Sequence, residues 1–245
     1  MSQQENFVSH LVELRDRLLR AVIGFLIIFV ALMAYPGAAY IFDLLALPIQ
    51  SALPEGTKMI ATGVVTPFMV PVKLTAMVAF VISLPVLLYQ AWAFIAPGLY
   101  QHEKKMALPI IFSSTVLFLL GIAFCHFIVF GKVFAFINDF APQSITPAPD
   151  IEAYMSFVLT MFMAFGMTFE VPIVVVVLVY LGVVTVEKLA EIRGYVIVGA
   201  FVIAAIVTPP DVMSQLFLAI PICILYEVGI LFAKVIGKQR QQILE

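Results

Sequence analysis

Hydrophobic and polar positions follow one another along this chain in long blocks. Six apolar segments cover approximately residues 18–36, 67–94, 109–130, 151–182, 195–208 and 212–233. Most of them reach the roughly 20 residues that a helix needs to cross a bilayer, whereas 195–208 corresponds to only about 21 Å of helix. The pattern predicts an all-α integral membrane protein with six transmembrane helices, the last two short, in a single polytopic domain over residues 1–245.

The segment before the first span, residues 6–20, has a helical pattern of its own. Phe7, Leu11, Leu14 and Leu18 recur at helical spacing. The pairs Glu13/Arg17 and Asp16/Arg20 have the i,i+4 spacing that brings opposite charges together on a helix. We therefore expect an amphipathic helix at the membrane surface that leads into the first span. The first apolar run exceeds the 7–15 residues of a signal peptide's apolar region, so we expect it to be retained.

Composition and charge agree with a membrane protein and predict its orientation. The chain is 63% hydrophobic and only 11% charged, with a mean hydropathy of +1.12. Most lysines and arginines fall on one side of the predicted spans, and only Lys58, Lys73 and Lys132 fall elsewhere. Because cytoplasmic loops carry the excess of Lys and Arg, both termini are expected in the cytoplasm.

The connection between the second and third spans combines aromatic and charged residues. It includes the only tryptophan, Trp92, a turn at Pro97-Gly98, and the run Glu103-Lys104-Lys105. Trp favours the membrane interface and Lys the cytoplasmic side, so we expect a structured cytoplasmic loop. Beyond the first span, residues 40–47 are short, apolar and aromatic, and are expected to lie along the opposite interface.

Glu170 lies about midway along the fourth predicted span, where an ionised side chain costs around 2.5–3.5 kcal/mol. We expect it to be protonated or paired. It could serve as a neutral hydrogen-bonding group between helices, or it could form a polar groove or partner contact. Glu227, on the last span, could instead extend toward the cytoplasmic surface near Lys234.

The connection between the last two spans carries further polar residues. Asp211 is well placed to cap the returning helix, and Gln215, one turn later, could bond to a neighbouring helix. Ala200, Ala204 and Thr208 form a stripe of small residues that suits close helix packing, within the chain or with a partner.

Residues typical of catalytic or metal chemistry are sparse. The two cysteines, Cys125 and Cys223, lie in apolar segments without CxxC spacing, and the three histidines have no HExxH context. We therefore expect no catalytic residues, metal or cofactor, and no nucleic-acid partner.

Several motifs together resemble one family. They are His10-Leu11-Val12-Glu13-Leu14-Arg15, Met59-Ile60-Ala61-Thr62, Trp92-Ala93-Phe94-Ile95-Ala96-Pro97-Gly98-Leu99-Tyr100 with His102-Glu103-Lys104-Lys105, Phe165-Gly166-Met167-Thr168-Phe169-Glu170-Val171-Pro172, and Thr208-Pro209-Pro210-Asp211. They span nearly the whole chain in order. The sequence resembles the TatC family, the signal-peptide receptor subunit of the twin-arginine protein translocase.

The resemblance implies a concave, glove-like scaffold in the bacterial cytoplasmic (inner) membrane. It implies that the chain binds the twin-arginine signal peptides of folded cargo and works with TatB and TatA, using the proton motive force. Self-association in a receptor complex and contact with membrane lipids are expected too. By motif position, signal-peptide binding is assigned to Glu13, Arg15, Phe94 and Glu103. Groove and partner contacts are assigned to Pro48, Glu170, Thr208, Asp211 and Gln215.

The chemistry of the ligand fits this assignment. Two adjacent guanidinium groups favour carboxylates at an interface of reduced dielectric, and Glu13 and Glu103 can supply two. Phe94 could pack against the apolar part of the signal peptide or against a guanidinium face. The alternatives are a small secondary transporter with Glu170 as its mid-membrane carboxylate, and an intramembrane hydrolase. The first would usually show an internal repeat, and the second needs a nucleophile and a base.

Overall fold

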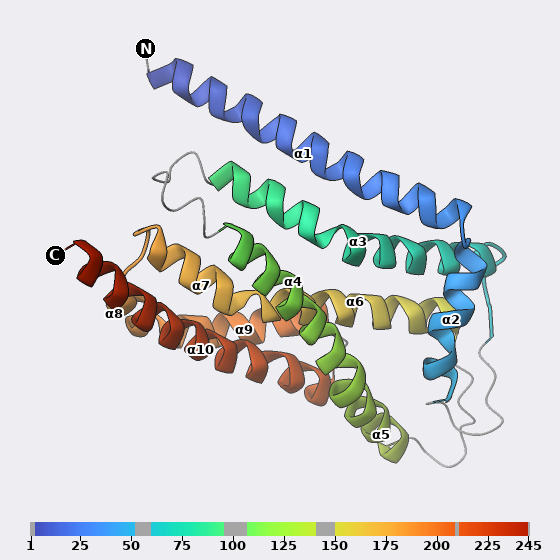
Figure 1. Ribbon diagram of the computed structural model, residues 1–245. Coiled ribbons are helices and arrows are strands. Elements are labelled where there is room, and N and C mark those ends of the chain that lie inside the picture. The colour runs from blue at the N-terminus through green and yellow to red at the C-terminus, as the bar shows by residue number, and fades with distance from the viewer. Residues whose placement is uncertain (1–2, 52–59, 96–106, 141–149, 209–210, 245) are drawn as a thin grey trace. The chain divides into compact units, whose positions relative to one another are not determined.

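The computed structural model describes the backbone of residues 3–51, 60–95, 107–140, 150–208 and 211–244. Its named elements are all helices, and an isolated bridge joins Ile60 to Asp150. The chain divides into two compact units. Unit 1 comprises Met1–Thr115 with Ala148–Met155, and unit 2 comprises Val116–Pro147 with Ser156–Glu245. Two helices, α4 (Ala107–Phe124) and α6 (Ile151–Phe169), contribute to both units (Figure 1).

The predicted class, an all-α membrane protein, is confirmed. Five helical stretches in the described part of the chain are long and apolar enough to cross a bilayer. They are Leu11–Ala34, Thr66–Phe94, Leu108–Phe136, Ile151–Tyr180 and Val212–Val235. The fifth predicted span, 195–208, corresponds to α9 (Arg193–Val207), an apolar helix of 15 residues. Of the last two helices only α9 is short, because α10 (Val212–Leu244) is 33 residues long and continues past its apolar stretch, which ends at Val235.

Unit 1 is built on two long helices that lie side by side. Helix α1 (Gln3–Ala34) runs along α3 (Thr66–Ile95) in the opposite direction, and α2 (Ala38–Ser51) packs against α3 (Figure 1). The chain turns between α1 and α2 at Gly37, whose φ of 96° is a conformation that glycine adopts readily. At Gly24 an added Cβ would lie 3.3 Å from Cγ1 of Val86, so α1 and α3 pack closely at this level.

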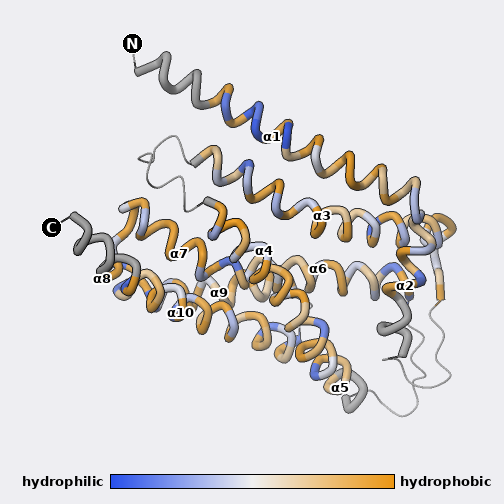
Figure 2. Tube along the Cα trace, viewed as in Figure 1, coloured by the Kyte–Doolittle hydropathy of each residue, from blue (hydrophilic) through white to orange (hydrophobic). Residues whose placement is uncertain are grey.

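Helix α1 differs from the sequence expectation in one respect. The amphipathic stretch 6–20 and the first span form a single continuous helix, not a surface helix followed by a separate span. Figure 2 shows the polar residues in the first half of α1 and the apolar ones in its second half. No proline or glycine interrupts residues 3–23, so nothing in the local sequence ends the helix at the membrane surface.

In unit 2, the third predicted span, which was expected to end at Phe130, continues as a helix to Phe140. The second half of α4 continues through a π-helical turn, η3 (Cys125–Val129), into α5 (Phe130–Phe140). Residues 131–140 were expected in a loop. Apolar side chains of this segment continue the packed surface instead. Val133 is fully buried, and the Phe134 ring contacts Phe130 in a tilted arrangement and Phe157 edge-on.

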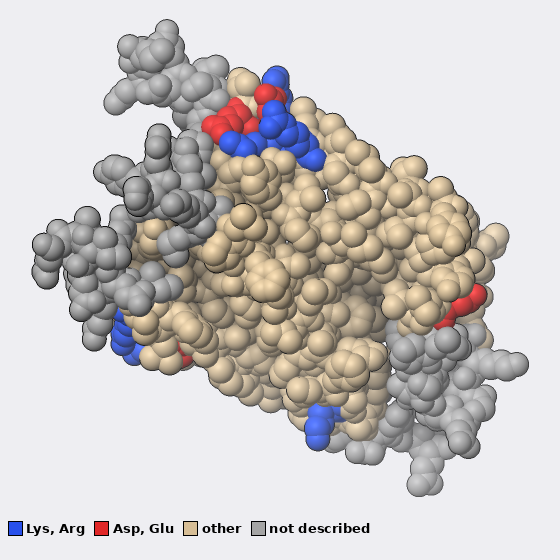
Figure 3. All heavy atoms as spheres, in the orientation of Figure 1, with Lys and Arg blue, Asp and Glu red and all other residues tan. Residues whose placement is uncertain are grey.

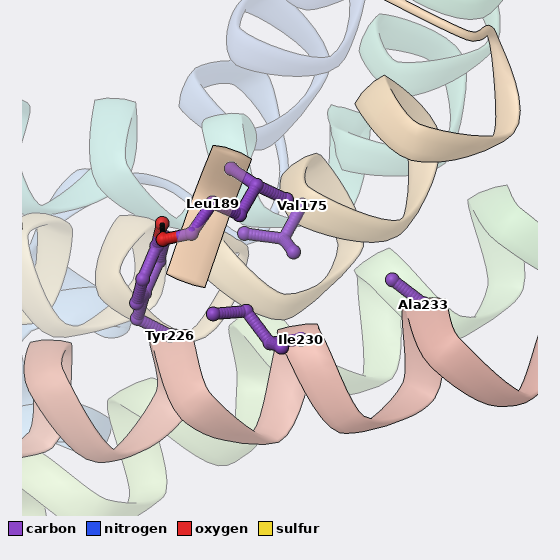
Figure 4. Close-up of a cluster of buried hydrophobic side chains, with 5 residues drawn as sticks. All are labelled: Val175, Leu189, Tyr226, Ile230 and Ala233. Atoms are coloured by element: carbon purple, nitrogen blue, oxygen red, sulfur yellow. Dashed lines mark hydrogen bonds between the residues drawn. The ribbon is translucent and has the colours of Figure 1, made fainter. Parts of the chain in front are cut away.

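The remaining helices of unit 2 pack around α10. Helix α7 (Val171–Tyr180), α8 (Val186–Glu191) and α9 all contact it. A buried cluster of Val175, Leu189, Tyr226, Ile230 and Ala233 joins α7 and α8 to α10 (Figure 4). The Tyr226 hydroxyl donates a hydrogen bond of 2.8 Å to the Leu189 carbonyl, so the polar tip of this buried ring is satisfied.

Candidate functional site

The first half of α1 carries two guanidinium–carboxylate pairs. Arg17 donates from Nε and Nη2 to Oε1 of Glu13, at 2.9 and 2.5 Å. Arg15 donates from Nε and Nη2 to Oδ1 of Asp16, at 2.9 and 2.8 Å. The predicted Glu13–Arg17 pair is therefore confirmed. The prediction for Asp16 was wrong, because its carboxylate contacts the neighbouring Arg15 and not Arg20.

The two pairs differ in exposure. The Glu13 and Arg17 side chains are 31% and 22% exposed, whereas those of Arg15 and Asp16 are 67% and 45% exposed. The Glu13–Arg17 pair is thus partly shielded from solvent, where a charge-assisted hydrogen bond is stronger than at an open surface. In Figure 3 positive and negative groups intermix in one patch over α1.

Phe94 lies within about one helical turn of the level of Glu13 in unit 1. Gly24 is level with Val86, and Glu13 precedes Gly24 by eleven residues. Because α1 and α3 run in opposite directions with the same rise per residue, Glu13 is level with a point just past the end of α3, about 4.5 Å along the axis from Phe94. Phe94, half-buried, is the second-last residue of that helix. Glu103 lies outside the described residues.

Trp92 lies two residues before Phe94, near the end of α3. Its side chain is only 5% exposed, so the ring packs against other parts of the chain. Phe94 is half-buried and keeps part of its surface accessible. The position of Trp92 at the membrane interface stays a prediction.

Glu170 lies within the fourth span, Ile151–Tyr180, as predicted, at the point where that span divides into two helices. Helix α6 ends at Phe169 and α7 begins at Val171, with Glu170 as the N-cap residue of α7 and Pro172 directly behind. Proline lacks an N–H group and clashes with the preceding turn, which explains the break. The Glu170 side chain is half-buried, with its Oε1 atom shielded from solvent.

The turn between α9 and α10 brings three predicted residues together. Asp211 Oδ1 accepts a 2.7 Å hydrogen bond from the Ser214 N–H, which confirms the predicted cap. Thr208 is buried and donates to the Ala204 carbonyl, and Gln215 Nε2 donates to the Phe201 carbonyl at 3.3 Å. The Gln215 amide thus joins α10 to α9 within the chain. Pro48 lies within α2, and its side chain is outside the described residues.

Glu227 finds a partner that the sequence analysis missed. Arg193, at the start of α9, donates from Nε and Nη2 to the two carboxylate oxygens of Glu227, at 2.6 and 2.8 Å. Glu227 was expected to reach toward the surface near Lys234, but this ion pair satisfies it directly. The available signal was Glu227 itself, an isolated carboxylate in an apolar segment that needs a cationic partner.

A second missed cluster lies in unit 1, where the start of α3 meets the start of α6. Lys73 Nζ donates to Glu152 at 2.9 Å, and the Thr66 hydroxyl donates to the same carboxylate at 2.8 Å. Asp150 accepts hydrogen bonds from the Thr62 hydroxyl, the Thr62 N–H and the N–H groups at the start of α6. These hydrogen bonds lower the pKa of Asp150 to about 2.

The predicted residues therefore fall into two sets. Glu13, Arg15 and Phe94 belong to unit 1, and Glu170, Thr208, Asp211 and Gln215 belong to unit 2. Pro48, predicted with the second set, belongs to unit 1. The first set offers a carboxylate and an aromatic ring at one end of a helix pair, which suits a cationic peptide with an apolar part. The second set consists of polar groups in or beside apolar helices, which suits helix packing.

Comparisons with known proteins agree on one family. Residues 9–221 match the family model described as Sec-independent protein translocase protein (TatC). The chain is 51% identical to the Sec-independent protein translocase protein TatC of Haemophilus influenzae (strain ATCC 51907 / DSM 11121 / KW20 / Rd), over 96% of this chain and 91% of that protein. It is 46% identical to the protein of the same name from Escherichia coli (strain K12), with the same two coverages. A crystal structure of the twin arginine translocase receptor TatC is similar at 42% identity and a TM-score of 0.80, covering 92% of this chain and 98% of that one.

Proposed function

The chain belongs to the TatC family, and from this membership we infer that it is the receptor component of a twin-arginine, Sec-independent protein translocase. It is a multi-pass membrane protein that works in a translocase complex with other Tat components. We place it in the bacterial cytoplasmic membrane with both termini in the cytoplasm. In this proposal the chain binds the twin-arginine signal peptides of folded proteins. With TatB and TatA, it then mediates their export, driven by the proton motive force.

One observation supports the location of the signal-peptide site above all others. Glu13 already holds a guanidinium group through two donors of Arg17, at the end of α1 that is level with Phe94. A carboxylate that accepts two N–H donors from an arginine of its own helix has the geometry to accept them from an arginine of a ligand. Glu103 follows α3 in the chain and is proposed as the second carboxylate, with Arg15 and Phe94 completing the site.

Glu13→Gln and Glu103→Gln should each weaken binding of a twin-arginine signal peptide by about tenfold or more, because each removes one charge-assisted hydrogen-bond acceptor. The measurement is titration of a fluorescent signal peptide into the full chain in nanodiscs. Asp43→Asn is the matched control, since Asp43 is an exposed carboxylate on α2, away from the α1 end that carries Glu13. Unchanged affinity in both glutamate variants would contradict the proposed site.

We further propose that Pro48, Glu170, Thr208, Asp211 and Gln215 support contacts with the single-span partners TatB and TatA. The outer face of α9 is apolar and exposed, with Ile206 79% exposed beside the turn that holds Thr208 and Asp211. A photo-crosslinker at Met213 or Gln215 should capture TatB or TatA in membranes. A crosslinker at Phe112 of α4, also exposed, is the control, and equal or stronger capture there would argue against docking at the α9–α10 turn.

A further inference from the structure

The arginines of α1 are themselves guanidinium ligands placed on the carboxylates of the same helix. Arg17 contacts Glu13 and Arg15 contacts Asp16, each through Nε and Nη2. A twin-arginine signal peptide presents two guanidinium groups of the same shape. The resting receptor therefore holds, on its own helix, the same chemical group that its ligand must deliver.

We propose that Arg17 is an internal competitor that occupies Glu13 until a signal-peptide arginine displaces it. The proposal deepens the proposed function and rests on Glu13 being part of the signal-peptide site. Arg17 and Glu13 are four residues apart on one continuous helix, so their contact re-forms whenever the ligand leaves. Binding then exchanges one guanidinium for another on the same carboxylate. The free energy gained on binding is therefore smaller than it would be if the carboxylate had no arginine to lose.

This arrangement has a functional consequence for a transport receptor. A receptor must release its signal peptide after each cargo, and an internal arginine that recaptures Glu13 favours release. It also returns the partly shielded Glu13 carboxylate to its Arg17 partner between cargoes. The more exposed Arg15–Asp16 pair, next to it on the helix, is screened by solvent and competes less.

The test measures affinity and dissociation rate of a labelled twin-arginine signal peptide with the full chain in nanodiscs. Arg17→Gln should tighten binding about fivefold and slow dissociation, since a partly shielded i,i+4 pair no longer has to be broken. Arg17→Lys, which keeps the charge but loses the planar fork, should lie between the wild type and Arg17→Gln. Arg20→Gln removes the same charge from an exposed position three residues away, and should change affinity less than twofold.

The outcomes separate this inference from the function on which it rests. In a Glu13→Gln background, Arg17→Gln should no longer tighten binding, because the group for which Arg17 competes is gone. If Glu13→Gln weakens binding but Arg17→Gln also weakens it or leaves it unchanged, Arg17 only supports the helix and the inference is overturned. If Arg17→Gln and Arg20→Gln raise the affinity equally, the effect comes from net charge alone, and the inference is overturned as well. If Glu13→Gln leaves affinity unchanged, Glu13 is not part of the signal-peptide site and the premise of this inference fails.

Discussion

Replacing Gly121 with alanine should destabilise the protein by about 1–3 kcal/mol or more, because the added methyl group has no room. A Cβ at this position of α4 would lie 2.4 Å from the carbonyl oxygen of Phe165 and 2.9 Å from its carbonyl carbon on α6. Both are backbone atoms, so a change of side-chain rotamer cannot relieve the overlap. The two helices would have to move apart, and the packing of Phe118 against Gly166 and of Phe124 against Phe165 would be disturbed with them.

The measurement is thermal unfolding in detergent, with two glycines of the same chain as controls. At Gly131 on α5 and Gly199 on α9, an added Cβ meets nothing within 4 Å. Alanine there should leave the midpoint unchanged or raise it, since alanine is about 1 kcal/mol better than glycine inside a helix. If the Gly121→Ala and Gly131→Ala proteins unfold at the same temperature, the close approach of α4 and α6 is contradicted.

Arg193→Leu is expected to destabilise the α9–α10 pair by about 1–3 kcal/mol, because it leaves the Glu227 carboxylate uncompensated within an apolar helix. Glu227 lies eight residues before the end of the apolar stretch of α10, or about 12 Å along the helix. Arg193 donates two hydrogen bonds from its planar guanidinium group, one to each carboxylate oxygen of Glu227, and a single point charge does not reproduce this arrangement.

A double variant distinguishes a lost ion pair from lost packing. Arg193→Leu combined with Glu227→Gln removes both charges, and should unfold at a higher temperature than Arg193→Leu alone. Glu187→Gln serves as a matched control, because Glu187 is an exposed acid in the first turn of α8 and should change the midpoint little. If the double variant is no more stable than the single one, the contribution of Arg193 comes from packing and not from its charge.

The two ion pairs on α1 show how well i,i+4 spacing in the sequence predicts the partner of a charged side chain. Glu13 and Arg17 were predicted to pair from their i,i+4 spacing, and they do. Asp16 has the same spacing to Arg20 but contacts Arg15. When several arginines are within reach of one exposed carboxylate, the energies of the alternatives differ by a few tenths of a kcal/mol. Sequence spacing then gives a set of candidate partners and does not choose among them.

Glu170 shows a similar division between local and tertiary information. The sequence places Pro172 two residues after Glu170, which is enough to predict a disturbed helix at that point. It does not show that the chain divides there into α6 and α7, or that Oε1 of Glu170 is shielded. Shielding depends on which neighbouring side chains cover the break, and these come from elsewhere in the chain.

The membrane class, the apolar helices, the Asp211 cap and the short α9 follow from the sequence, because each depends on residues within a few turns of one another. The family resemblance follows from the order of motifs along nearly the whole chain. The partners of isolated charges and the burial of Trp92 depend on tertiary packing. Arg193 and Glu227 are 34 residues apart, and Lys73 and Glu152 are 79 apart. Such pairs depend on the register in which two helices pack. That register is set by contacts such as Gly24 against Val86 and Gly121 against Phe165, which the periodicity of a single segment does not encode.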